Sequence, residues 1–211
     1  MVNFIGVFII LGVILVSMMF HELAHGGVAY LLGDTTAKED GRLTLNPLKH
    51  VDPFMSIILP VLLYLMKAPV FGGAKPVPVD FSRLKGGVWG MALVAIVGPL
   101  VNFLLALICF LFMYATNVDI DGIFGMILYE GVVVNLGFMV FNLLPIPPLD
   151  GSRLLYFLAP DGARIVLERF ERYGFIAIYI MILLCGGLFS SLIGNIIGDI
   201  LRFFYFLVGN V

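Results

Sequence analysis

Two histidines and a glutamate near the start of the chain have the spacing of a metal site. The segment His21-Glu22-Leu23-Ala24-His25 is an HExxH pattern. On a helix, positions i and i+4 share one face, so both imidazoles can reach the same ion. Glu22 lies beside them and can act as a general base toward a metal-bound water. The pattern therefore predicts metal-assisted hydrolysis.

The surroundings of this group sharpen the prediction. It interrupts an apolar run over residues 2–32 and lies about 12 Å of helix before Gly33, at about 1.5 Å per residue. Ionisable side chains at such depth in a membrane span are costly and mark a functional site. The alternative is a polar cluster that holds neighbouring helices together.

A zinc site needs a third protein ligand and an open position for water. The sixth residue after His25 is not a histidine, so the third ligand must come from elsewhere in the chain. We expect it to be Asp150, in the segment 142–151 that follows an apolar run. The alternative for Asp150 is a turn-forming Asp-Gly pair at a helix start. His50 and Asp52, in a polar loop, are rival ligands.

The composition places the chain in a membrane. Of its 211 residues, 61% are hydrophobic and only 12% are charged, whereas a soluble domain carries roughly 25% charged residues. With a mean hydropathy of +1.10, most of the surface must face the lipid bilayer. The net charge of −2 is too near zero to indicate nucleic-acid binding. Cys109 and Cys185 both lie in apolar stretches, so no disulfide framework is implied.

The apolar runs predict an all-α polytopic membrane protein with five full transmembrane helices and one re-entrant hairpin, six membrane segments in all. The run 54–66 is short and carries Pro60, so we expect it to be the re-entrant segment. A short extended or β segment is expected in the loop 67–87, where residues 75–81 alternate in polarity. The five spans are expected at residues 2–32, 88–115, 123–144, 175–189 and 192–208, with a short turn at Ser190–Ser191 between the last two.

Basic residues predict the orientation of these spans, because cytoplasmic loops carry an excess of Lys and Arg. They gather in the loops 33–52, 67–87 and 150–173, whereas the turn 117–121 has none. A re-entrant segment at 54–66 puts all three loops on one side. We therefore expect the N-terminus outside, the C-terminus inside and the active site toward the cytoplasm. Arg202 lies in none of these three loops and is expected to pair with Asp199, three residues earlier.

Three segments resemble the site-2 protease family of intramembrane zinc metalloproteases, in a compact form without a PDZ or CBS domain. The HExxH group matches the first family motif. The segment 142–151, with Leu149-Asp150-Gly151, matches the second, and Gly98-Pro99-x-x-Asn102 matches a weaker signature. The resemblance covers about residues 5–155.

The resemblance also implies roles for individual residues. In the family, residues at the positions of His21, His25 and Asp150 bind one Zn²⁺ per chain, and the residue at Glu22 is the catalytic base. Asn142 matches an asparagine thought to contact the substrate. Asn102 is a second candidate for substrate binding, with helix packing as the alternative.

The family's activity is the hydrolysis of peptide bonds in transmembrane proteins or peptides, known as regulated intramembrane proteolysis. The resemblance implies an integral protein of a prokaryotic cell membrane. We expect residues 1–211 to form a single membrane-embedded protease domain, with a catalytic core at about 1–155 and a C-terminal helical pair at 173–208. The segment 75–81 is a candidate for capturing an unwound substrate by strand addition, with a plain linker as the alternative.

Two other functions fit part of the pattern. One is a zinc-binding membrane protein without proteolysis, against which the intact Glu22 argues, because zinc binding does not need that residue. The other is a secondary transporter with an intramembrane His/Glu/Asp site. A transporter of that kind would show two inverted halves with broken helices in corresponding positions, and the sequence shows no such pairing.

Overall fold

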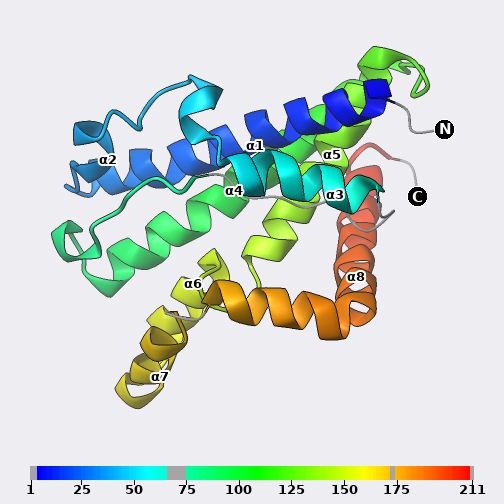
Figure 1. The fold of residues 1–211 in the computed structure, drawn as a ribbon. Coiled ribbons are helices and arrows are strands. Elements are labelled where there is room, and N and C mark those ends of the chain that lie inside the picture. The colour runs from blue at the N-terminus through cyan, green and yellow to red at the C-terminus, as the bar shows by residue number, and fades with distance from the viewer. Residues whose placement is uncertain (1–3, 66–74, 172–173, 210–211) are drawn as a thin grey trace.

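The computed structural model of the chain describes residues 4–65, 75–171 and 174–209, and every regular element in these ranges is a helix (Figure 1). The all-α prediction is confirmed. Four helices are long: α1 (Phe4–Leu31), α4 (Val88–Thr116), α5 (Ile123–Asn142) and α8 (Gly174–Leu207). The shorter elements are α2 (Thr36–Glu39), η1 (Pro47–His50), η2 (Pro53–Ile58), α3 (Leu59–Leu65), η3 (Phe81–Arg83), α6 (Asp150–Leu158) and α7 (Asp161–Glu171).

In the part of the chain that the structure describes, four stretches of helix are long and apolar enough to cross a membrane. They are Ile5–Leu31, Val88–Thr116, Ile123–Asn142 and Gly186–Leu207. A span needs about 20 residues to cross a hydrocarbon core of about 30 Å, and each of these has at least that length. The chain is therefore an integral membrane protein, but five full spans plus a hairpin are not confirmed.

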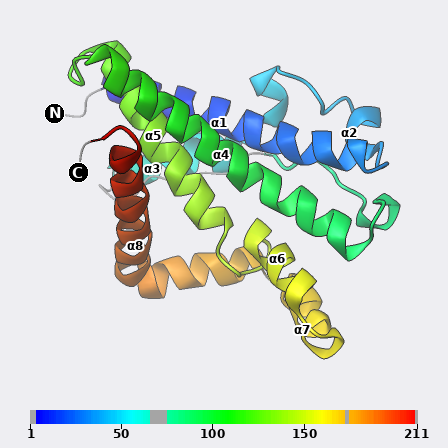
Figure 2. The same cartoon turned by 180° about the vertical axis from the view of Figure 1, so that it is seen from behind.

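The predicted break between two C-terminal spans is wrong. Helix α8 continues without interruption through Ser190 and Ser191. A serine keeps its backbone N–H, so neither residue removes a hydrogen bond from the helix as a proline would. Figures 1 and 2 show instead that α8 bends, so that its two arms run in different directions. The predicted pairing of Asp199 with Arg202 is present in its second arm.

The end of α8 lies beside the end of α4. The Tyr114 hydroxyl donates to the Val208 carbonyl at 3.4 Å, and the rings of Phe110 and Phe204 are 5.3 Å apart. Helix α1 begins at the same end of the molecule (Figures 1 and 2). The described residues supply one candidate crossing in the C-terminal region where two were expected, so the prediction of termini on opposite sides is not confirmed.

Close packing of α1, α4 and α5 forms the frame of the molecule. Ile14 and Met18 of α1 pack against Val134 and Phe138 of α5. Small residues let the backbones approach, as is usual between helices in lipid. At Gly131 of α5, for example, a Cβ atom would lie 2.7 Å from the sulfur of Cys109 on α4.

The segments expected to be re-entrant and extended are described in part. Residues 53–65 are helical through Pro60, as η2 followed by α3, and α3 packs against α1. A hairpin that dips in and returns within 54–66 is not confirmed, because η2 is followed directly by α3 as far as Leu65. Residues 75–80 form no strand, so the β part of that prediction is wrong for them. Asp80 nevertheless has an extended backbone, with φ −92° and ψ 95°.

Candidate active site

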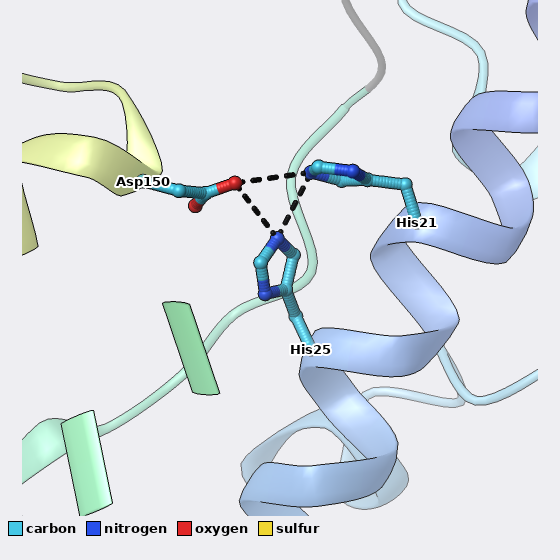
Figure 3. Close-up of side chains that lie close together, drawn as sticks. All are labelled: His21, His25 and Asp150. Carbon is cyan, nitrogen blue, oxygen red and sulfur yellow. Dashed lines mark hydrogen bonds and ion pairs between the residues drawn. The ribbon is translucent and has the colours of Figure 1, made fainter. Parts of the chain in front are cut away.

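The three predicted ligands come together at one point (Figure 3). The Nε2 atoms of His21 and His25, one turn apart on α1, are 2.9 Å from each other. Asp150, the first residue of α6, places its Oδ2 atom 3.2 Å from Nε2 of His21 and 3.3 Å from Nε2 of His25. Both histidines are buried. Within the described ranges, these are the residues whose geometry would suit a metal ion.

Two acceptor groups of helix α4 fix the orientation of both imidazoles through their Nδ1 atoms. Nδ1 of His21 lies 2.6 Å from Oδ1 of Asn102, and Nδ1 of His25 lies 2.6 Å from the Val94 carbonyl oxygen. Both partners accept hydrogen bonds, so each Nδ1 carries the proton and donates it. The lone pair of each Nε2 then faces Asp150, which is the tautomer that binds a metal.

The donor set fits a zinc ion. Two imidazole nitrogens and a carboxylate oxygen are zinc ligands of the type found in catalytic sites. Oδ2 of Asp150 is buried and receives no hydrogen bond. With both histidines in the Nδ1-protonated tautomer, three electron-rich atoms face one another at about 3 Å. A cation between them removes that repulsion.

Gly98 makes room for the pair of imidazoles. A Cβ atom at this position would lie 2.4 Å from Nε2 of His25 and 2.7 Å from Cε1 of His21. No side chain can occupy that space without moving a ring. The Gly98–Asn102 segment, which had been a weak signature, therefore lies directly against the site.

In the second motif, segment 142–151, the position of Asp150 depends on the glycine that follows it, Gly151. Helix α6 starts close to the end of α5, and a Cβ atom at Gly151 would lie 2.2 Å from the Leu143 carbonyl oxygen. Glycine thus lets the α6 N-terminus approach the α5 C-terminus. The Asp-Gly pair does begin a helix, as the alternative reading had it, and that position aims the carboxylate at the histidines.

Glu22 faces a different neighbour. Its Oε2 accepts a hydrogen bond from the Val77 amide at 2.7 Å. Val77 belongs to residues 75–80, which we call the strap. The strap is also held by Arg42, which donates to the Lys75 carbonyl at 2.6 Å. At its other end the Asp80 amide donates to Oδ2 of Asp34 at 2.7 Å.

The remaining predicted site residues have other partners. Nε2 of His50 donates to the Thr44 carbonyl at 2.9 Å, and Asp52 accepts from the Phe54 amide, so neither joins the metal group. Asn142, the last residue of α5, donates to the Phe138 carbonyl at 3.0 Å.

Asn102 is fully buried, and both ends of its amide are bonded to protein groups. This arrangement fits the support of His21 better than contact with a substrate. Sequence reasoning missed the roles of Gly98, the Val94 carbonyl and Asn135. Gly98 carried a signal as part of the weak Gly98-Pro99-x-x-Asn102 signature, and Asn135 carried one as a polar residue inside an apolar span.

Comparison with known proteins decides the family. YwhC of Bacillus subtilis (strain 168), provisionally named a zinc metalloprotease, is 41% identical over 175 residues, which cover 80% of this chain and 77% of YwhC. The chain belongs to peptidase family M50. The family model itself matches residues 117–185. Rip2 of Mycolicibacterium smegmatis, also provisionally named a zinc metalloprotease, is 32% identical over 189 residues, covering 86% of this chain and 69% of Rip2.

Family M50 is the site-2 protease family, so the predicted resemblance is confirmed. This M50 peptidase is a zinc metalloprotease whose apolar helices place it in a membrane, and zinc is its cofactor. The family acts on substrates embedded in the bilayer. No solved structure matches the chain significantly.

Proposed function

We propose that His21, His25 and Asp150 bind the zinc ion of this M50 peptidase and that Glu22 is its catalytic base. The observation that supports the proposal is the convergence of two imidazole Nε2 atoms and one carboxylate oxygen within 3.3 Å of each other. Glu22 directly follows His21 on the same helix turn, as the base of an HExxH pattern does.

Zinc at such a site acts as a Lewis acid that activates water and polarises a carbonyl oxygen. The protein's own residues supply the rest. The Glu22 carboxylate takes a proton from the attacking water and later gives it to the leaving amine. The Val77 amide holds this carboxylate in one orientation. Asn102 and the Val94 carbonyl hold the imidazoles in the tautomer that leaves Nε2 free.

The proposed substrate is a transmembrane protein or peptide, cut at a bond exposed at the depth of His21 and His25. Both histidines lie inside the candidate span Ile5–Leu31, which supports cleavage within the membrane. Asn142 is the proposed substrate contact, because it is partly exposed at the end of α5, in the segment that leads to Asp150. Residues 1–211 would form one protease domain, with the site carried by residues up to about 155.

The proposed orientation places the site on the cytoplasmic side of a prokaryotic membrane. The basic residues of the loops after α1 and before α4, and those of α6 and α7, support this orientation. With the four candidate crossings of the described residues, this proposal puts both termini outside, whereas the five predicted spans would put the C-terminus inside. A reporter enzyme fused after residue 211 that is active only outside the cytoplasm tests this proposal. Activity supports it, and inactivity in an expressed fusion contradicts it.

The test of the zinc site is metal stoichiometry in detergent-purified protein, measured on wild type and on Asp150→Ala. We expect about one zinc per wild-type chain, and a substantial loss in the variant because a three-ligand site loses one ligand. A folded, metal-replete wild type without zinc would overturn the proposal. Zinc retained in full by Asp150→Ala would overturn the role of Asp150 alone.

A further inference from the structure

A line of buried polar groups runs from the candidate zinc site into the helix frame. Nδ2 of Asn102 donates to Oδ1 of Asn135 at 2.8 Å. Nδ2 of Asn135 donates to the Ser17 hydroxyl at 2.9 Å and to the Gly131 carbonyl at 2.8 Å. The exposed fractions of Ser17, Asn102 and Asn135 are 3%, 0% and 3%, so water does not compete for these bonds. We call the three residues the amide relay.

The Gly131 carbonyl gives the relay its direction. A backbone carbonyl can only accept a hydrogen bond, whereas a side-chain amide has one donating and one accepting end. Asn135 must therefore turn its NH₂ toward Gly131, which leaves its oxygen facing Asn102. The Asn135 oxygen can only accept, so Asn102 must turn its NH₂ toward it. The Asn102 oxygen is then left facing His21. Ser17 cannot set the direction, because a hydroxyl both donates and accepts.

The direction matters because His21 has two tautomers. With the Asn102 oxygen at Nδ1, the proton stays on Nδ1 and the lone pair is on Nε2, toward Asp150. If the Asn102 amide turned over, its NH₂ would face Nδ1. Nδ1 would then have to accept, and the proton would sit on Nε2, where the ligand atom is needed.

We infer that Asn135 is a positioning residue for zinc binding, which fixes the tautomer of His21 through the orientation of the Asn102 amide. The inference rests on the proposed role of His21 as a zinc ligand. Asn135 lies on α5 and touches neither the histidines nor Asp150 through any hydrogen bond described, so its effect is transmitted by Asn102 alone.

The first test is the zinc dissociation constant of Asn135→Leu in detergent, by competition with a chelator. Loss of a residue that orients a zinc-bound histidine costs about 10- to 100-fold in metal affinity, and we expect about tenfold here. Ser17→Ala leaves the Gly131 carbonyl in place and should change the affinity by less than about twofold. Leu136→Ala, which opens a cavity next to Asn135 on the face toward α8, is the matched control for loosened packing and should keep wild-type affinity.

The second test removes the dependence on amide orientation. In Asn102→Asp, both carboxylate oxygens accept, so Nδ1 of His21 stays protonated whatever occupies position 135. Asn135→Leu should then cost less than about twofold in the Asn102→Asp background, against about tenfold alone, a coupling that a double-mutant cycle measures. If Asn135→Leu does not fold, Asn135→Ala replaces it, since alanine favours the helix and offers the Asn102 amide no polar atom.

The outcomes separate the two proposals. Equal losses in both backgrounds would mean that Asn135 only supports packing, and an unchanged affinity of Asn135→Leu would also overturn the inference. Either result leaves the zinc site intact, because wild type still binds the metal. Absence of zinc binding in wild type would instead overturn the proposed function.

Discussion

Nδ1 of His25 lies 2.6 Å from the main-chain carbonyl oxygen of Val94, so one of the two histidines of the site is oriented by the backbone. Its neighbour His21 is oriented by a side chain, that of Asn102. The two histidines therefore differ in how far a substitution can disturb them.

This difference gives the first prediction. Asn102→Leu removes the acceptor of His21 and should weaken zinc binding about 10- to 100-fold. Val94→Ala removes a buried side chain but keeps the carbonyl, so it should lower the free energy of unfolding by about 1–3 kcal/mol and leave zinc affinity unchanged. Chelator competition and thermal unfolding measure the two effects. Equal losses of affinity in both variants would contradict this account.

The second prediction concerns the space beneath the imidazoles. Gly98→Ala puts a methyl group where His25 and His21 now lie, so both rings must move and zinc should be lost by more than about tenfold. Gly27→Ala is the matched control, because a Cβ atom there meets nothing within 4 Å. Zinc content after dialysis compares them. A Gly98→Ala protein with full zinc would show that the site relaxes around the methyl group.

The third prediction separates binding from chemistry. Glu22→Gln keeps an oxygen that can accept from the Val77 amide, so the strap should stay in place. The variant should bind zinc normally and lose about 10²- to 10⁴-fold in cleavage rate, the usual contribution of a general base. Cleavage of a transmembrane substrate and zinc content are measured together. Residual cleavage near the wild-type rate would exclude Glu22 as the base.

The fourth prediction concerns pH and the strap. Burial alone would raise the pKa of Asp34, but hydrogen bonds from Thr36 and from the Asp80 amide lower it below its usual value. A lowered pKa means that the ionised carboxylate stabilises the fold above the ordinary value of about 3.9, and that this stability is lost as pH falls through the lower folded value. Acidification below the lowered pKa of Asp34 should therefore release the Asp80 amide.

Hydrogen exchange over residues 75–80, corrected for the intrinsic effect of pH on exchange, measures that release. Protection should fall on acidification in wild type and be low at every pH in Asp34→Ala. Protection that is the same in both proteins at neutral pH would show that Asp34 does not hold the strap.

The sequence predicted that the two histidines lie together, because local rules are enough for this pair. Helical periodicity puts His21 and His25 on one face, and the depth of an ionisable group in an apolar run marks it as functional. The third predicted ligand, Asp150, was chosen from its segment after an apolar run and then from the family motif around it, since nothing local tells which distant carboxylate meets the histidines.

What the sequence did not predict depends on distances between helices. The role of Gly98 follows from how closely α4 approaches α1, and that of Asn135 from its contact with Asn102 across two helices. Neither distance is encoded in a pattern along one segment. The continuity of α8 was missed for a different reason: a pair of serines interrupts hydropathy without interrupting a helix.

The contact of both imidazoles with Gly98 has a mechanical meaning. The two rings of α1 lie there directly against the backbone of α4, and their bonds to Asn102 and to the Val94 carbonyl join the two helices on either side. A hinge motion between α1 and α4 would displace both imidazoles, so the two helices must move as one rigid unit. The strap differs in this respect, because a single hydrogen bond joins it to Glu22, and a bond to a charged group contributes about 1.5–3 kcal/mol.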